Sequence, residues 1–250
     1  MSQARQTNII NLRAIRVACQ ECSLNTLCLP LGMDQAELNR LDDIIERKSP
    51  VNRGDHLFQI GDDFHAVYAV RSGSLKSYAT TENGHEQIIG FHFPGELIGL
   101  DAIAEGVHPL ATRALETTSV CAIPYDQLDS LSGELPGLRS QLLRLMSREI
   151  SHDEQNMIIL GQKSADERLA TFLIGLSNRF ALRGFSSTEF NLSMSRGDIG
   201  NYLGLALETV SRLFTRFQQD GLIRVERKFI EILEYDQLYA LAGGEHSDHS

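Results

Sequence analysis

Three cysteines, Cys19, Cys22 and Cys28, lie within a stretch of ten residues near the N-terminus. Thiolates at this spacing can bind one metal centre without any long-range folding. A closed zinc site or an iron–sulfur cluster normally uses four ligands, and the one cysteine that remains in the sequence is Cys121. We therefore expect Cys121 to supply the fourth ligand, so that a metal centre would tie the N-terminal segment to the body of the protein.

Other interpretations of these cysteines remain open. Free cysteine is often a small buried hydrophobic residue, and Cys121 lies in a strand-like apolar run, Ser119–Ile123. Disulfides are disfavoured, because Met1–Gln20 lacks the apolar region of a secretory signal and four cysteines in 250 residues are sparse for a secreted scaffold. We expect a cytoplasmic protein, and the spacing does not decide between zinc and iron–sulfur.

The charge is distributed unevenly along the chain. The net charge is −10, yet residues 163–230 carry 10 Lys and Arg against 7 Asp and Glu. This basic stretch points weakly to nucleic-acid binding by the C-terminal third. No apolar run in the sequence approaches the ~20 residues of a membrane span, so no membrane partner is expected.

The N-terminal half shows one helical pattern and then a strand pattern. Asp34 and Glu37 form the capping box of a helix whose apolar stripe continues to about Lys48. From Val51 to Tyr125, short alternating runs are separated by glycines about ten residues apart, which is typical of an antiparallel barrel, roll or sandwich. Residues 1–18 have no clear periodicity and are expected to be loosely ordered.

A long helix is predicted from Pro136 for about 25 residues. An apolar seam repeats along it every three and four residues, as in a helix that pairs with its twin. The seam consists of Leu143, Met146, Ile150, Asp153, Met157 and Leu160. The alternative is a single amphipathic core helix. Asp153 is unusual within the seam, because across a two-fold axis its carboxylate would face its own copy.

The C-terminal third has the pattern of a winged helix-turn-helix. Ser164 and Glu167 form a second capping box. The segments Ser195–Gly204 and Leu207–Phe217 predict two helices joined by a glycine-bearing turn, and Leu222–Ile232 predicts a two-stranded wing.

The second of these two helices carries candidate DNA-reading side chains. Glu208, Ser211 and Arg212 lie on one face, at the end of the helix that meets base edges in the major groove. Arg212 can donate two hydrogen bonds to guanine, Glu208 can accept from cytosine, and Ser211 suits either kind of base. Phosphate contacts are expected from Arg216, Ser195 and Arg196. The alternative is a surface helix with an internal Glu208–Arg212 pair.

Together these features resemble the cyclic-AMP receptor (CRP) family of bacterial regulators, and within it the oxygen-sensing FNR/ANR branch. The resemblance extends from about Cys19 to Gly243. Besides the cysteine spacing it rests on Ile88-Ile-Gly-Phe-His-Phe, Ala114-Leu-Glu-Thr-Thr, Arg196-Gly-Asp-Ile-Gly-Asn-Tyr-Leu-Gly-Leu, and Glu-x-x-Ser-Arg in the second helix.

The resemblance implies an α+β fold. An N-terminal antiparallel, cupin-like β-roll would be the sensor domain, followed by a long dimerisation helix and a C-terminal winged helix-turn-helix. The expected boundaries are 1–29 for a cluster-binding segment, 30–135 for the roll, 136–162 for the dimerisation helix, 163–243 for the DNA-binding domain and 244–250 for a disordered tail.

The resemblance also implies a function. The branch holds one oxygen-labile [4Fe–4S] cluster per subunit, which maps onto Cys19, Cys22, Cys28 and Cys121. With its cluster intact, the homodimer binds double-stranded DNA at sites like TTGAT-N4-ATCAA. It activates anaerobic respiration genes through contacts to RNA polymerase and represses some aerobic ones. Molecular oxygen converts the cluster to a [2Fe–2S] form, after which the dimer loosens and DNA is released.

The sequence departs from the family at three places. His85 stands where relatives often have an acid on a polymerase-activating turn. Leu207 replaces an arginine with which the cyclic-AMP receptor reads its own operator. Gly95–Thr112 lacks the nucleotide-binding Gly-Glu and Arg-Ser pairs, so no cyclic nucleotide is expected.

Two competing classes remain beside a cluster-gated regulator. An iron–sulfur enzyme or electron carrier is disfavoured, because the sequence shows no acid–base constellation and its histidines are scattered. We therefore expect a protein that is not an enzyme. A CRP-type regulator with a structural zinc or a thiol-redox response is not excluded by spacing.

Overall fold

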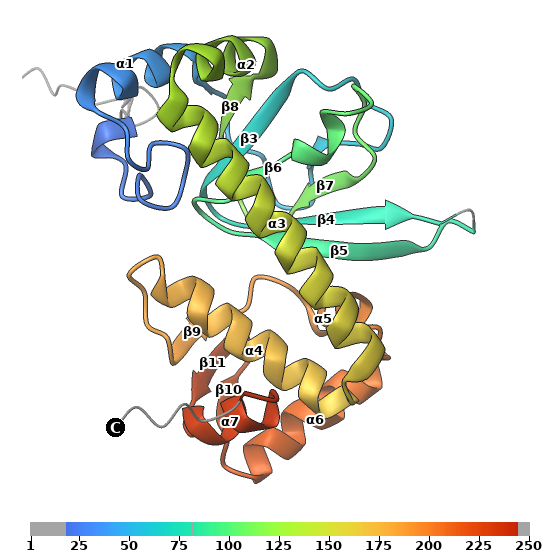
Figure 1. Cartoon of the computed structure of the whole chain (residues 1–250). Coiled ribbons are helices and arrows are strands. Elements are labelled where there is room, and N and C mark those ends of the chain that lie inside the picture. The colour runs from blue at the N-terminus through green and yellow to red at the C-terminus, as the bar shows by residue number, and fades with distance from the viewer. Residues whose placement is uncertain (1–18, 82, 245–250) are drawn as a thin grey trace, which may run out of the picture.

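The computed structural model describes residues 19–81 and 83–244. The loose order expected for residues 1–18 and the disorder expected for the tail from residue 245 fall outside the described residues. The chain forms a β-roll and a winged helix-turn-helix, which are connected by the long helix α3 (Pro136–Gln162) (Figure 1). This arrangement confirms the predicted α+β fold.

The roll consists of two four-stranded sheets in which every pairing is antiparallel, as predicted. Its strands are β1 (Glu46–Arg47), β2 (His56–Phe58), β3 (Ala66–Ser72), β4 (Leu75–Thr80), β5 (Glu86–His92), β6 (Leu97–Ile98), β7 (Ala111–Ala114) and β8 (Ser119–Pro124). The strand orders are β1-β8-β3-β6 and β2-β7-β4-β5. A short 3-10 helix, η3 (Leu100–Ala102), lies between β6 and β7.

Helix α1 (Gln35–Ile44) begins at the predicted capping box. The Asp34 carboxylate accepts from the Glu37 N–H, and the Glu37 carboxylate accepts from the Asp34 N–H. The prediction that this helix continues to about Lys48 is wrong, because residues 46 and 47 form β1 and pair with β8. Helix α2 (Tyr125–Glu134) follows β8 and was not predicted.

Strand β3 also departs from the predicted alternation. Its first five residues, Ala66–Val70, are all buried. Alternate side chains enter two different apolar clusters, one shared with α2 and α3 and the other with neighbouring strands. Because both faces of the strand are covered, no residue is left on a solvent face to show the period of two.

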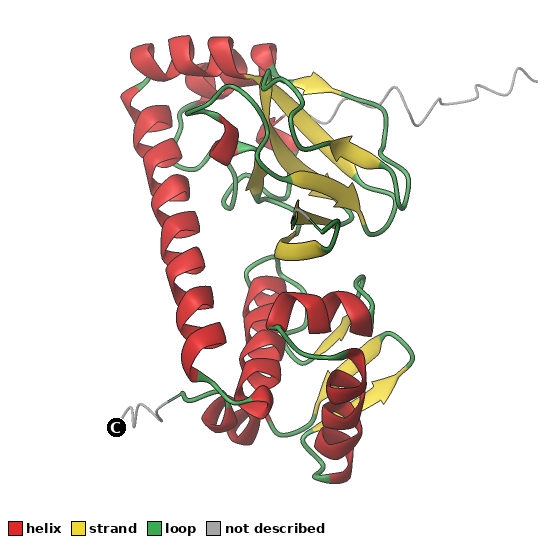
Figure 2. Ribbon diagram, turned by 90° about the vertical axis from the view of Figure 1, so that its right-hand side faces the viewer, coloured by secondary structure: helices red, strands yellow, loops and turns green. Residues whose placement is uncertain are grey.

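Helix α3 agrees with the predicted long helix. Pro136 occupies its first turn, where a missing N–H costs nothing. The helix runs along one side of the molecule from the roll to the winged part (Figure 2). Leu138 is buried, and Leu142 and Leu145 pack partly buried against the same cluster. No described helix is both long and apolar enough to cross a membrane.

The winged part confirms the predicted helix-turn-helix and wing. Its elements are α4 (Ala165–Ala181), β9 (Glu189–Asn191), α5 (Arg196–Leu203), α6 (Leu207–Gln219), β10 (Ile223–Glu226), β11 (Phe229–Ile232) and α7 (Tyr235–Leu241). Capping boxes at Ser164 and Ser195 begin α4 and α5, and Gly204 ends α5 at φ 65° in the left-handed region. Strand β9 joins the wing as a third strand in the order β10-β11-β9, and α7 was not predicted.

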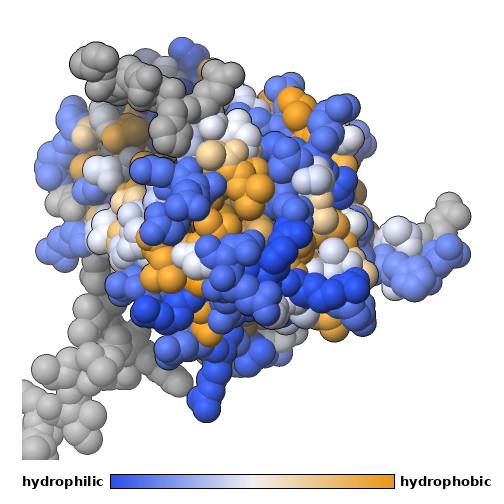
Figure 3. All heavy atoms as spheres, turned by 90° about the horizontal axis from the view of Figure 1, so that it is seen from below, coloured by the Kyte–Doolittle hydropathy of each residue, from blue (hydrophilic) through white to orange (hydrophobic). Residues whose placement is uncertain are grey.

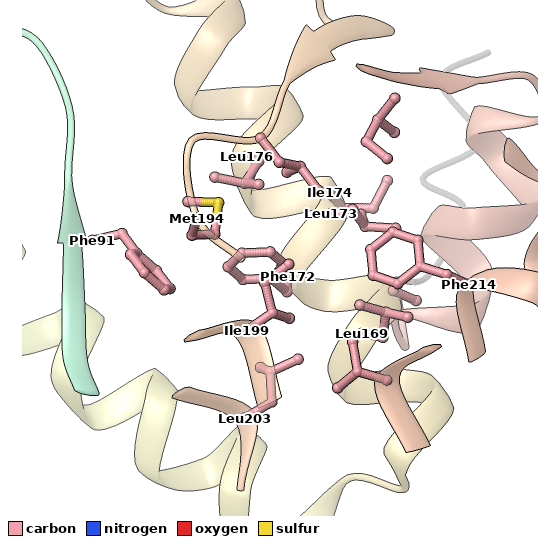
Figure 4. Close-up of a cluster of buried hydrophobic side chains, with 14 of the residues drawn as sticks. Phe91, Leu169, Phe172, Leu173, Ile174, Leu176, Met194, Ile199, Leu203 and Phe214 are labelled. Carbon is pink, nitrogen blue, oxygen red and sulfur yellow. The ribbon is translucent and has the colours of Figure 1, made fainter. Parts of the chain in front are cut away.

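One apolar core joins the winged part to the roll. In Figure 4, Phe91 of β5 points toward Phe172 of α4, and their ring centroids lie 6.0 Å apart. Tyr78, Ile88 and Phe93 of the roll belong to the same cluster as the buried residues of α4, α5 and α6. The two parts are therefore packed together as well as connected through α3.

Candidate cysteine site and DNA-binding surface

The four cysteines come from separate parts of the fold. Cys19 begins a short 3-10 helix, η2 (Cys19–Glu21), and Cys22 and Cys28 lie in the turns that follow. Cys121 lies in β8, paired with Arg47 of β1 on one side and with Ala69 of β3 on the other. All four line one small cavity between residues 19–29, here called the cysteine loop, and the β1-β8-β3-β6 sheet. The structure thus brings together the four residues that the sequence singled out.

Hydrogen bonds hold the cysteine loop at both ends. The backbone N–H of Cys19 donates to Asp42 Oδ1 of α1 at 3.1 Å. The N–H of Cys28 donates to the carbonyl of Leu24 at 3.1 Å, which folds the segment between the second and third cysteines into a tight turn. The Cys28 carbonyl accepts from Gln141 Nε2 of α3 at 3.1 Å. The loop is therefore attached to α1 and to α3.

Burial favours the protonated form of three of these thiols, Cys19, Cys28 and Cys121. Burial raises the pKa of Cys28 to about 12, and burial together with the nearby Asp42 carboxylate raises the pKa of Cys19 to about 12. Burial also raises the pKa of Cys121, although Arg47 and Arg71 act in the opposite direction. Thiolates in this cavity therefore require a compensating positive charge, which metal ions supply.

The donor set fits an iron–sulfur cluster or a zinc ion, since both take thiolate ligands. The metal-binding geometry is not already formed. Within residues 19–81 and 83–244, no three His, Cys, Asp or Glu side chains are grouped closely enough to hold a metal ion. Ligation by all four cysteines therefore requires some rearrangement of their side chains or of the cysteine loop, and the ligand role stays a prediction.

Helix α6 presents the predicted base-reading face to solvent. Glu208, Ser211 and Arg212 are exposed, while Val210, Leu213, Phe214 and Phe217 on the opposite face are buried in the core. No ion pair joins Glu208 to Arg212 in the described part of the chain, so both side chains are available to a ligand. The end of the molecule seen in Figure 3 is mostly hydrophilic, with smaller apolar patches.

The three predicted phosphate-binding residues have partners within the domain. The Ser195 hydroxyl caps α5 and donates to Asp198 Oδ2 at 2.6 Å. The Arg196 guanidinium lies 3.1 Å above the Phe214 ring, and burial lowers its pKa to about 10. Arg216 forms an ion pair of 2.5 Å with Asp166 of α4. Each would have to leave its present position to contact a phosphate with its side chain.

The predicted seam of α3 faces away from the roll. Leu143 and Ile150 are each 60% exposed and Met157 is 68% exposed. Leu160 and Asp153 are also exposed, and Met146 is half-buried. Ile158, which the sequence analysis did not include, is 60% exposed on the same helix. These apolar side chains leave a surface that a second helix can cover.

Sequence reasoning missed the contacts between roll and winged part. Glu96, between β5 and β6, forms ion pairs of 2.5 Å with Arg179 and with Arg183 of the winged part. Lys76 of β4 forms another of 2.7 Å with Asp198 of α5. Partners more than 80 residues apart leave no local pattern in the sequence by which these ion pairs could have been found.

Comparison with known proteins defines the class of this fold and site. Residues 167–241 match the Crp-like helix-turn-helix domain, and residues 48–134 match the cyclic nucleotide-binding domain. A roll of this type followed by this helix-turn-helix defines a DNA-binding transcription regulator of Crp type. The second match identifies the domain, and the prediction that no cyclic nucleotide binds stays a prediction.

Similar proteins show to which group of Crp-type regulators the chain is most similar. The chain is 55% identical over 237 residues to the transcriptional activator protein Anr of Pseudomonas aeruginosa, covering 94% of this chain and 97% of the relative. It is 53% identical over 227 residues to the fumarate and nitrate reduction regulatory protein of Escherichia coli K12, covering 91% of each. The structure of FixK2 from Bradyrhizobium japonicum matches with a TM-score of 0.72 at 31% identity, over 78% of this chain and 97% of that one.

The chain belongs to the Crp/Fnr family of transcription regulators, in the group of the Anr and Fnr proteins. Its relatives are regulators rather than enzymes, in agreement with the sequence analysis.

Proposed function

We propose that this protein is an oxygen-responsive transcription regulator that holds one [4Fe–4S] cluster per subunit on Cys19, Cys22, Cys28 and Cys121. The observation that carries the proposal is that all four cysteines line one cavity although they come from the cysteine loop and from β8. The names of the relatives support it, because two of them are described as regulatory proteins of fumarate and nitrate reduction. We place the protein in the cytoplasm, with its DNA.

The chain's own residues would take three parts in holding the cluster. The four thiols would lose their protons on ligation, and iron would offset the burial that now favours the neutral form of Cys19, Cys28 and Cys121. Strand pairing on both sides holds Cys121 in the sheet. Any adjustment of the ligand positions would therefore be made by the cysteine loop, which carries the other three thiols. When bound, the cluster supplies a centre that reacts with molecular oxygen. Loss of that centre would free the loop from the sheet.

The exposed seam of α3 is the proposed dimer interface. Leu143, Ile150 and Met157 are exposed apolar residues spaced by seven, as in a coiled coil. A dimer would place two copies of α6 side by side, so that each reads one half of a TTGAT-N4-ATCAA-like site. We propose that the bound dimer activates anaerobic genes through RNA polymerase and represses some aerobic ones.

Purification in the absence of oxygen tests the proposal. The expected result is a brown protein with close to four iron and four sulfide per subunit. Replacing each cysteine singly by serine should abolish the visible absorption, whereas Thr26→Ala, at an exposed hydroxyl in the same loop, should leave it unchanged.

The same experiment separates the alternatives. A colourless protein with one zinc per subunit would show a metal-stapled regulator instead. Full iron and sulfide in Cys121→Ser would remove Cys121 from the ligand set.

A further inference from the structure

Gln141 is a buried polar residue that belongs to α3 and contacts the cysteine loop. Its side chain is almost completely enclosed, at 1% exposure, in a part of α3 whose other inward residues are leucines. Its Nε2 donates to the carbonyl oxygen of Cys28 at 3.1 Å, across 113 residues of sequence. A buried polar side chain normally has hydrogen-bond partners for all its polar atoms. This hydrogen bond satisfies only the nitrogen end of the Gln141 amide.

The other half of the amide has no partner. Since a carbonyl oxygen can only accept, the nitrogen end of the Gln141 amide must be the end that faces Cys28. The Oε1 atom is buried and accepts no hydrogen bond from any described residue. The amide is therefore held by the loop at one end and left unsatisfied at the other. A loop position that also brought an N–H to Oε1 would be favoured over the present one.

The position of Gln141 on α3 makes this contact relevant to dimerisation. A helix advances by about 100° per residue, so Leu143, Ile150 and Met157 lie on the side of α3 opposite Gln141. The inward leucines next to it, Leu138 and Leu145, pack in the same apolar cluster as Cys28 and Cys121. A displacement of the Cys28 backbone therefore acts on the inner face of the helix whose outer face is the seam.

We propose that Gln141 is the positioning residue that couples the cysteine loop to α3. The Gln141 amide would hold α3 in one of two positions. In one position the loop bonds only to Nε2, as in this structure, and in the other it also donates an N–H to Oε1. This inference rests on the proposed function for the meaning of the loop movement, but the link itself is a property of the protein without its metal.

Hydrogen exchange of the metal-free protein tests the link directly. The informative amides are those of Asn25, Leu27 and Cys28, each of which donates within the turn that leads up to the Cys28 carbonyl. Gln141→Leu keeps the bulk and removes the donor, and Gln141→Glu places an acceptor against the carbonyl. Both should speed exchange in this turn by about tenfold, the order expected for one lost buried hydrogen bond. Gln155→Leu, an exposed glutamine of the same helix, is the matched control and should change nothing there.

Sedimentation of the anaerobically loaded protein tests the coupling. Gln141→Leu should bind its full complement of metal yet dimerise about tenfold more weakly than the wild type, which corresponds to 1.4 kcal/mol. Gln155→Leu should dimerise normally.

Three outcomes would overturn the inference. One is unchanged exchange in the turn, and a second is equal acceleration throughout the protein, which would show a merely structural role. The third is normal dimerisation of Gln141→Leu. If the protein proves to bind zinc or no metal, the proposed function fails while the exchange result still stands or falls by itself.

Discussion

Glu96 of the roll and Arg183 of the winged part form an ion pair of 2.5 Å in which the Arg183 side chain is only 4% exposed. Arg179 pairs with the same carboxylate and also donates to the carbonyl of Phe91. Arg183 donates further to the carbonyl of Pro94. Both guanidinium groups are thus held by backbone and carboxylate together, which makes this contact a rigid one between the two parts.

Glu96→Gln should destabilise the protein in a pH-dependent way. Burial alone would raise the pKa of Glu96, but Arg179 and Arg183 lower it to about 2 from an ordinary value of 4.5. A depressed pKa stabilises the fold above the unfolded value and loses that effect as pH falls from about 4.5 toward 2. The loss at neutral pH should be about 3 kcal/mol, measured by urea unfolding at pH 7 and at pH 3.

The matched control is Glu86→Gln. Glu86 also pairs across strands, with Arg113 at 3.0 Å, but its side chain is 36% exposed. Its loss should cost less than about 1 kcal/mol. Equal losses for the two variants, or a loss for Glu96→Gln that is as large at pH 3 as at pH 7, would show that the buried pair is not responsible.

Gly200→Ala should damage the helix-turn-helix even though alanine favours helices. A Cβ at this position in α5 would lie 2.6 Å from the carbonyl oxygen of Leu205, in the turn before α6. Overpacking of this kind costs about 1–3 kcal/mol, against a gain in helix propensity of up to ~1 kcal/mol. Gly197→Ala in the same helix meets nothing closer than 3.6 Å and should be neutral or stabilising. Thermal unfolding of both variants checks the opposite signs.

Arg212→Ala should affect sequence discrimination. Loss of its contacts should cost about 1–3 kcal/mol on the specific site and relax the preference at one G·C pair. Binding assays on the specific site and on random DNA measure both effects. An equal loss on both kinds of DNA would assign Arg212 to the phosphates instead.

Arg216→Ala should weaken binding to every sequence alike. If Arg216 leaves Asp166 to reach a phosphate, its removal should lower the salt dependence by about one counterion. The slope of affinity against salt concentration is the measurement. An unchanged slope would mean that the Asp166 pair persists on DNA.

Asp153→Ala should dimerise without its metal. Asp153 is exposed within the apolar seam, and in a symmetric pair the two carboxylates would repel by roughly 1–4 kcal/mol. That is enough to change a dimerisation constant by tenfold or more. Sedimentation in air should show a dimer for Asp153→Ala and a monomer for Gln155→Ala, an exposed residue on the other side of α3. A monomeric Asp153→Ala protein would end this hypothesis.

The sequence was sufficient wherever a local signal fixes the structure. Capping boxes at Asp34 and Ser164 marked two helix starts correctly, since their hydrogen bonds lie within four residues. The left-handed glycine at Gly204 marked the turn between α5 and α6 for the same reason. The candidate cysteines were equally visible, because three of them are close together in the chain.

Features that depend on contacts between distant parts of the chain could not be predicted from the sequence. Helix α1 stops at Ile44 because Glu46 and Arg47 are taken up by pairing with β8. The alternation of β3 vanished because helices cover its second face. The link from Gln141 to Cys28 joins residues that no periodicity relates. In each case the deciding partner is distant in sequence and close only in the fold.

The apolar core shared by the roll and the winged part limits how the molecule can respond. Side chains packed as tightly as Phe91 against Phe172 do not slide past one another. Turning the winged part would first expose that surface, at roughly 25 cal/mol for each Å². Intermediate tilts are therefore high in energy, and reorientation would be a jump between two packed states. A gradual change in the signal would then alter how many molecules occupy each state, while the shape of each state stays the same.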